Sequence, residues 1–235
     1  QRQMCIRDSV IASTAVVGVF FTGIISGIST GPSKSPAPML SDIKAGLSYI
    51  LGNHLVFLLL LMGLATALFA MPFRFLMPIF VVDIYGRGPD ALGLLVTIIG
   101  LGSLIGSLWI ATLRRSNRGF ILIVTCFVSA IGLLLVATIP FYYAAVVFML
   151  IIGLGDAGRR TLNMALIMEI TEDQYRGRVM SVFMMNFGLM PLGVLPAGII
   201  AEFFGGQMSI GLLALLLLIT SAVILVSQKR LRDFQ

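Results

Sequence analysis

This chain has 235 residues, of which 58% are hydrophobic and only 11% are charged, and its formal net charge is +6. An ordinary soluble domain has roughly 45–50% apolar and 25% charged residues, so a chain this apolar cannot cover a water-exposed surface and belongs in a lipid bilayer. This composition excludes a soluble domain. A nucleic-acid-binding protein is excluded as well, because most of the positive charge lies in short segments between apolar runs.

The first nine residues, QRQMCIRDS, are polar and unlike the sequence that follows. We interpret residues 1–9 as a non-native leader, because they are polar and their Met is not the first residue. The order of charged, apolar and small residues does not fit a signal peptide. Residues 10–28 then form an apolar run of the length that one membrane-spanning helix requires, about 20 residues.

Residues 29–54 form the longest polar stretch and begin with Pro, Ser and Gly, which is typical of a linker. From Ser41 the pattern changes, because Ser41 can cap a helix. The apolar residues after it share one face of that helix: Ile43, Leu47, Ile50 and Leu51. We expect a short helix here that lies in the membrane surface.

Six further apolar runs are each long enough to cross a membrane: 55–82, 91–113, 119–139, 141–168, 179–201 and 208–227. Their connections are short, so we expect residues 55–227 to form one six-helix bundle, followed by a polar tail at 228–235.

Lys and Arg in the loops predict the orientation of the chain. If the spans alternate in direction, one side carries only Arg87, and the other side carries Lys34, Lys44, Arg114, Arg115, Arg118, Arg176, Arg178, Lys229, Arg230 and Arg232. The linker and the C-terminal tail are therefore expected to face the cytoplasm, in a bacterial inner membrane.

The predicted span 141–168 carries charges in the segment GLGDAGRRTLNMALIME, where an apolar sequence would be expected. If a span ended at Asp156, too few residues would remain for the crossings on either side. One helix over 141–168, about 42 Å long, avoids this problem. On it Asp156, Arg160 and Asn163 share one face at spacings i, i+4 and i+7, with Arg159 beside them.

A charge at the bilayer centre costs about 2.5–3.5 kcal/mol on insertion scales. The charged face is therefore expected to look into the bundle or a wet cavity, with Gly153, Gly155 and Gly158 leaving room around it. Two interpretations stay open. Asp156 and Arg160 line a central cavity in which Asp156 is a candidate for proton coupling, or they form a permanent pair that holds helices together.

Arg74 is a second charge inside a predicted span, between Pro72 and Pro78. One interpretation is recognition of an anionic or aromatic substrate. The other is pairing with a residue outside this bundle. We also consider a cation–π contact with one of the nearby rings of Phe73, Phe75 and Phe80.

Small residues and prolines mark two of the spans. The spacing of Gly102 and Gly106 predicts close helix packing. The span 179–201 combines residues that permit bending with residues that permit close approach: Gly188, Pro191, Gly193, Pro196 and Gly198.

The segment DQYRGRVMSVFMMNFGLMPLGVLPAGIIAEFFG, 173–205, resembles the drug/proton-antiporter and siderophore-exporter branch of the major facilitator superfamily, which includes the enterobactin exporter. The cytoplasmic motif RGRVMS corresponds to residues 176–181, followed by a Gly/Pro-rich helix. The segments DIKAGLSYILGNH and LGLLVTIIGLGSLIGS are also similar, so the resemblance covers nearly all of 41–227.

This resemblance implies an all-α membrane protein in which 10–28 is the last helix of an N-terminal bundle and 55–227 is the C-terminal six-helix bundle of a major facilitator fold. It implies a missing N-terminal half as partner. It also implies proton-coupled export of small amphipathic molecules, such as drugs or siderophores, by alternating access. The loop residues Arg176, Arg178, Arg114 and Arg115 are then gate residues or lipid contacts.

Two other functions are considered: import of a small polar solute by a member of the same superfamily, and a non-transporting membrane scaffold or signalling protein. An enzyme is not expected. His54 is the only His, and Cys5 and Cys126 lie far apart, so no metal site, cofactor site or catalytic triad is indicated.

Overall fold

Six helical segments of the computed structural model are long and apolar enough to cross a membrane: 54–84, 89–112, 118–138, 142–170, 176–204 and 206–226. Each lies within three residues of a predicted span at both ends. Between these helices the described part of the chain contains only turns and short connections, without strands. The prediction of an all-α membrane fold is confirmed.

The structure describes residues 13, 16, 19–20, 39–112 and 118–227. The chain divides into two units, Gln1–Ser41 and Asp42–Gln235, and the bundle belongs to the second. Several predicted features lie outside the described residues: the leader 1–9, most of the span 10–28, the first part of the linker, Arg114, Arg115 and the tail 228–235. The four described positions within 10–28 are helical.

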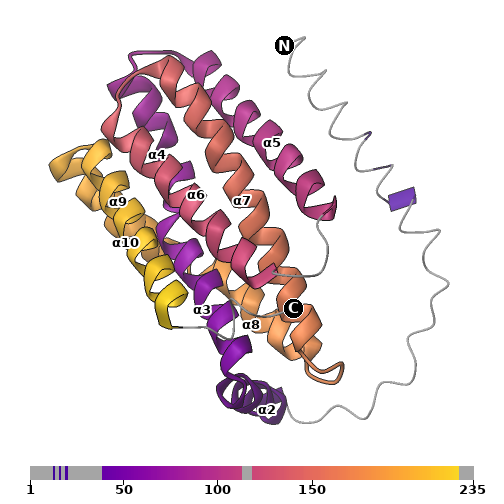
Figure 1. Ribbon diagram of the computed structural model, residues 1–235. Helices are drawn as coiled ribbons and strands as arrows, with labels where there is room; N and C mark the ends of the chain where they lie inside the picture. Colours follow the sequence, from indigo (N-terminus) through magenta and orange to yellow (C-terminus); the bar gives the residue numbers. More distant parts are fainter. Residues whose placement is uncertain (1–12, 14–15, 17–18, 21–38, 113–117, 228–235) are drawn as a thin grey trace. The chain divides into compact units, whose positions relative to one another are not determined.

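Of the six spans of the bundle, the first and the fifth are interrupted and the other four are continuous helices (Figure 1). The first span consists of α3 (His54–Phe69), α4 (Pro72–Ile79) and the π-helical turn η1 (Phe80–Ile84). The next three are α5 (Pro89–Thr112), α6 (Arg118–Thr138) and α7 (Tyr142–Ile170). The fifth is shared by α8 (Arg176–Gly188) and α9 (Pro191–Phe204), and the last is α10 (Gly206–Ser227).

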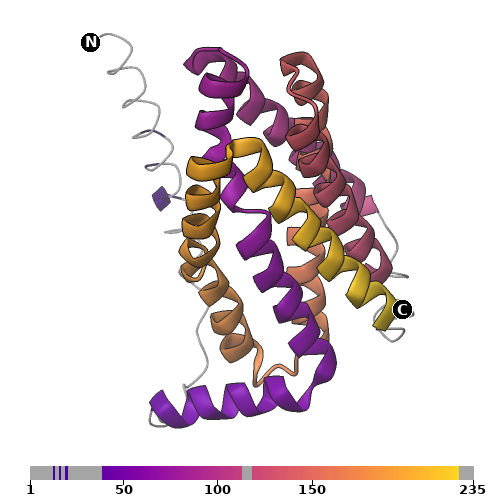
Figure 2. The same cartoon turned by 90° about the vertical axis from the view of Figure 1, so that its left-hand side faces the viewer.

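Both interrupted spans break immediately before a proline, since α4 begins at Pro72 and α9 begins at Pro191. Proline has no backbone N–H and is tolerated in the first turn of a helix. Gly193 of α9 lies against the backbone of Leu68 in α3, where a Cβ atom would overlap the carbonyl group. The two breaks therefore lie close together, on neighbouring spans (Figure 2).

The remaining Gly and Pro residues of the span formed by α8 and α9 are not at the contact that Gly193 makes with α3. Pro196 lies inside α9. A Cβ atom added at Gly188 or Gly198 would meet no other atom within 4 Å, so packing does not require glycine at these two positions.

Helix α7 packs closely against α5 through glycines on both helices. Gly102 of α5 lies against the carbonyl of Leu150, and a Cβ atom at Gly106 would lie 2.9 Å from the carbonyl oxygen of Leu154. In return, Gly153 of α7 lies against the carbonyl of Ile99. Close backbone approach of this kind is what small residues permit in membrane helices.

The other two glycines of α7 face α6. A Cβ atom at Gly155 would overlap Ser129, and one at Gly158 would overlap the side chain of Thr125. The expectation that these glycines leave room around the charged residues is therefore wrong. They bring α6 and α7 together, because Gly155 lets the backbone of α6 approach and Gly158 makes room for the Thr125 side chain.

Gly102→Ala is expected to destabilise the protein, whereas Gly100→Ala on the same helix is not. The added methyl group at Gly102 would overlap the backbone of α7, but at Gly100 it would meet nothing within 4 Å. Overpacking typically costs about 1–3 kcal/mol, and Gly→Ala in an uncrowded helix gains about 0.5–1 kcal/mol. Thermal unfolding in detergent should show a lower Tm for Gly102→Ala only, and equal Tm values would contradict this account.

The predicted linker helix is present as α2 (Met39–Gly52), but it begins two residues before Ser41, so Ser41 is not its cap. The side chain that caps a helix in this region is Asn53, which accepts a hydrogen bond from the backbone N–H of Val56 at 3.4 Å, at the start of α3. Of the predicted apolar face, Ile50 is buried while Leu47 and Leu51 are exposed.

Candidate functional site

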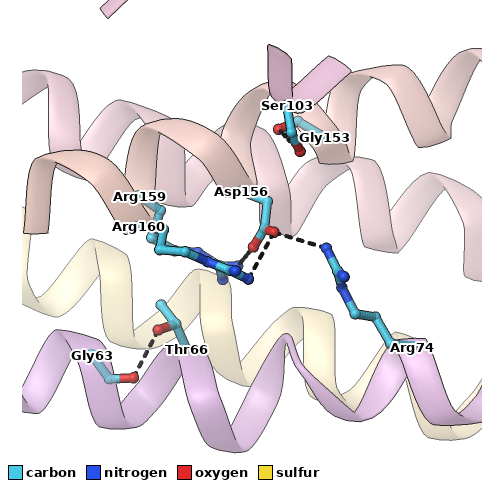
Figure 3. A network of polar contacts seen from close by, with 8 residues as sticks. All are labelled: Gly63, Thr66, Arg74, Ser103, Gly153, Asp156, Arg159 and Arg160. Atoms are coloured by element: carbon cyan, nitrogen blue, oxygen red, sulfur yellow. Dashed lines mark hydrogen bonds and ion pairs between the residues drawn. The ribbon is translucent and has the colours of Figure 1, made fainter. Parts of the chain in front are cut away.

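Asp156 lies in α7 and is contacted by three guanidinium groups (Figure 3). Arg74 Nη2 and Arg160 Nη2 both donate to Asp156 Oδ2, at 3.1 and 3.2 Å. Arg159 Nη2 donates to the other carboxylate oxygen, Oδ1. We call these four residues the charged cluster.

The three arginines of the charged cluster differ in burial. Asp156 and Arg159 are buried, with relative exposures of 7% and 6%. The side chains of Arg74 and Arg160 are each 48% exposed. The cluster therefore consists of an inner ion pair and two outer arginines that share one carboxylate oxygen.

Local structure explains how the four side chains meet. On α7 the spacings i, i+3 and i+4 put Arg159 and Arg160 one turn after Asp156. Arg74 comes from the first turn of α4, because the break before Pro72 restarts the helix there, and its backbone N–H bonds to the carbonyl of Met71 at 3.1 Å. Figure 3 shows Arg74 pointing from α4 toward Asp156.

Two small cavities flank the inner ion pair. The first has a volume of about 40 Å³, and its walls include Asp156, Arg159, Arg160, Asn163, Asn186, Met71, Phe183 and Phe187. The second, of about 20 Å³, also contacts Asp156 and Arg159, and is lined by Arg74 and Ser129. Each cavity is thus lined by both polar and apolar side chains.

Several buried polar atoms around these cavities have no hydrogen-bond partner among the described residues: Arg159 Nη1, Asn163 Oδ1, Asn186 Nδ2 and Ser129 Oγ. Buried polar groups are normally satisfied by protein or water. Their grouping around two cavities that both contact Asp156 and Arg159 is therefore unusual for a region that only packs helices.

The structure brings together all five residues singled out as substrate or proton pathway candidates. Asp156, Arg159, Arg160 and Asn163 line the larger cavity, and Arg74 joins them through Asp156. The pair Arg74–Asp156 was not predicted, because 82 residues separate its members in the sequence. The considered cation–π contact of Arg74 is not observed among the described residues, where its partner is Asp156.

Asn186 and Ser129 were also missed by the sequence analysis. Asn186 is buried in α8. A buried amide side chain is uncommon in a membrane span. That signal was available in the sequence. Ser129 offered none, because Ser is frequent at membrane helix contacts.

At one end of the bundle, Arg176 binds the C-terminus of α7. Its Nε donates to the carbonyl oxygens of Met168 and Thr171, at 3.0 and 3.2 Å, and its Nη1 lies 2.5 Å from a carboxylate oxygen of Asp173. A cation at the C-terminus of α7 also interacts favourably with the negative end of the helix dipole.

Two further contacts lie at this end of the bundle. Arg178 lies over the ring of Tyr175, and that ring stacks on Tyr49 of α2 with centroids 4.3 Å apart. Arg118 pairs with Glu169 at 3.3 Å. The described arginines of the predicted loops thus tie helix ends to one another.

Comparison with known proteins gives two findings. Residues 55–233 match the protein family described as "Major Facilitator Superfamily". A curated relative, the "Staphyloferrin A transporter" of Staphylococcus aureus, is 27% identical over 133 residues, which make up 55% of this chain. The match spans about a third of that relative, 33% of its length.

Proposed function

This chain belongs to the Major Facilitator Superfamily and is a multi-pass membrane transporter rather than an enzyme; on that basis we propose that it is the C-terminal half of a proton-coupled exporter of small amphipathic molecules. The 33% coverage of the relative supports the existence of a second half. In the experiments below, the protein that contains both halves is called the complete transporter.

The observation that carries the proposal is the charged cluster. Asp156 and Arg159 are buried on a helix that crosses the membrane, and both line cavities. Charged residues inside spans are costly and typically mark substrate or ion pathways. A membrane scaffold has no need of them, so this observation favours a transporter whose substrate and ion move past the cluster.

Asp156 is the proposed proton carrier. Two of its three arginine contacts come from half-exposed side chains that share the atom Oδ2, and one of these, Arg74, comes from a different span. A movement between the spans would separate Arg74 from Asp156. Once the Arg74 guanidinium group has moved away, the carboxylate can take up a proton more readily, because a nearby positive charge favours the ionised form.

The interrupted spans provide the movement. The breaks before Pro72 and Pro191 remove regular helical hydrogen bonding at neighbouring places in the bundle. Discontinuous helices near the binding site are a recurring feature of secondary transporters. We infer that these two spans bend as the transporter alternates between its inward-open and outward-open states.

The expected orientation places the end with Lys44, Arg118, Arg176 and Arg178 in the cytoplasm of a bacterial inner membrane. Arg87 lies in the connection at the opposite end, between η1 and α5. An excess of Lys and Arg at one end of the bundle is typical of loops that face the cytoplasm. At the cytoplasmic end, the arginines that tie helix ends together are suited to act as a gate or as lipid contacts.

Transport by the complete transporter in lipid vesicles tests this function. With an acidic interior, vesicles carrying inside-out protein are expected to accumulate radiolabelled staphyloferrin A, the compound in the relative's name, and a protonophore is expected to abolish the accumulation. Accumulation that needs the opposite gradient would indicate import. Absence of gradient-dependent flux for this compound and for a set of amphipathic drugs would overturn the proposal.

A further inference from the structure

The charged cluster has an excess of positive charge. It contains three guanidinium groups and one carboxylate, and the described ion pairs of Arg74, Arg159 and Arg160 all end on Asp156. Glu169 and Asp173, which lie nearer the end of the bundle, pair with Arg118 and Arg176 instead. An uncompensated charge within a membrane is costly, so the cluster is suited to receive another anion.

The excess charge is concentrated on the two outer arginines. Arg159 is buried against Oδ1, whereas Arg74 and Arg160 are half-exposed and each donates through one nitrogen to Oδ2. A guanidinium group has five N–H donors, so most donors of both outer arginines remain available as far as the described residues are concerned. Because both groups contact the same oxygen, they lie within two hydrogen-bond lengths of each other, which suits one small anionic group.

The present partner of the two arginines indicates which anion fits. The group that they already bind is a carboxylate, that of Asp156, and guanidinium groups match carboxylates in shape as well as in charge. The cavity that Arg160 lines also has apolar lining residues, among them Met71, Phe183 and Phe187. The surroundings therefore suit a carboxylate attached to an apolar body.

From these observations we propose that Arg74 and Arg160 form the binding site for a carboxylate group of the transported molecule, so that the substrates are amphipathic organic acids. This inference rests on the proposed transport function. The substrate carboxylate takes the place of Asp156 Oδ2 between the two outer arginines, and Asp156 keeps its bond to Arg159. Asp156 is thus a built-in competitor for the site, and substrate binding loosens two of its three ion pairs.

Binding of a matched pair of probes tests the proposal. The complete transporter in lipid nanodiscs is titrated with 2-naphthoate and with 2-naphthamide, which share an apolar body but differ in charge, and the heat of binding is measured. The carboxylate is expected to bind at least about tenfold more tightly, because hydrogen bonds between charged groups outweigh those to a neutral amide. Equal affinities of the two probes for the wild-type protein would overturn the proposal without any variant. That result is also expected if an acidic residue of the other half neutralises the arginines.

Two variants locate the site. Arg74→Gln and Arg160→Gln are each expected to weaken 2-naphthoate binding by roughly ten- to a hundredfold and to leave 2-naphthamide binding nearly unchanged. The matched control is Arg118→Gln, which removes an arginine that pairs with Glu169 outside the charged cluster. Weakened binding of both probes alike in the first two variants, or an equal weakening in the control, would overturn the assignment.

Asp156→Asn distinguishes a competitor from a structural anchor. If Asp156 competes for the outer arginines, the variant binds 2-naphthoate roughly tenfold more tightly, because the amide holds guanidinium groups less strongly than a carboxylate. Weaker or unchanged binding would overturn the competition.

The outcomes also separate this inference from the transport function. Gradient-driven flux of neutral compounds without a preference for carboxylates would leave the function standing and overturn the inference. Selective binding of 2-naphthoate without gradient-driven flux would support the site and overturn proton-coupled transport.

Discussion

Asp156→Leu is expected to lower the free energy of unfolding of the complete transporter by about 3–5 kcal/mol, the usual effect of removing one partner of a buried ion pair. Arg159 is 6% exposed, and its described ion pair is with Asp156. Without that carboxylate the guanidinium group is buried and uncompensated. A denaturant titration in detergent micelles measures this destabilisation.

Arg159→Leu is expected to cost less than Asp156→Leu, because Asp156 retains Arg74 and Arg160 as partners. The double variant with Leu at both positions should recover most of the stability, since replacing a buried pair by apolar residues is often neutral. Arg118→Leu removes one member of a more exposed pair with Glu169 and should cost no more than about 1 kcal/mol. A double variant as unstable as Asp156→Leu would contradict this interpretation.

Asp156→Asn is expected to abolish accumulation of substrate driven by a proton gradient. An amide oxygen can still accept hydrogen bonds from arginine, so the geometry around α7 is largely kept, but an amide does not bind the transported proton. The measurement is uptake into vesicles with and without a protonophore, alongside substrate binding. We expect binding to persist while the protonophore-sensitive part of the uptake disappears.

Glu169→Gln is the matched control, because it makes the same chemical change at another carboxylate of α7, one that pairs with Arg118 near the end of the helix. This variant should accumulate substrate normally. Protonophore-sensitive accumulation by Asp156→Asn would show that the transported proton is carried elsewhere, and the cluster would then act only in substrate binding and stability.

Sequence reasoning was most successful for the spans. The helix α7 was predicted to continue through Asp156, Arg159 and Arg160, because ending it there would leave segments too short to cross a bilayer. The structure confirms one helix from Tyr142 to Ile170. Bilayer thickness constrains helix length regardless of which helices are neighbours, so the length of α7 could be predicted without its packing.

The local surroundings of single residues differ from what the sequence predicts. Ser41 fits the chemistry of a helix cap, yet α2 begins at Met39 and the observed cap is Asn53. The glycines of α7 were expected to leave space for charges, but Gly155 and Gly158 contact α6. A glycine in a sequence shows only that a side chain is missing, and the neighbouring helix decides what uses the space.

Composition and helical periodicity were enough to establish the membrane environment, the spans of the bundle and the shared face of Asp156, Arg160 and Asn163. These properties act over a few turns of one chain, so a linear sequence contains them. The packing of the helices was needed to show that Arg74 reaches Asp156, that Arg159 is the buried partner, and that the two proline breaks lie close together. The pairing of Arg74 and the meeting of the breaks join spans that are far apart in the sequence, and burial depends on every neighbouring helix, so no local pattern could reveal them.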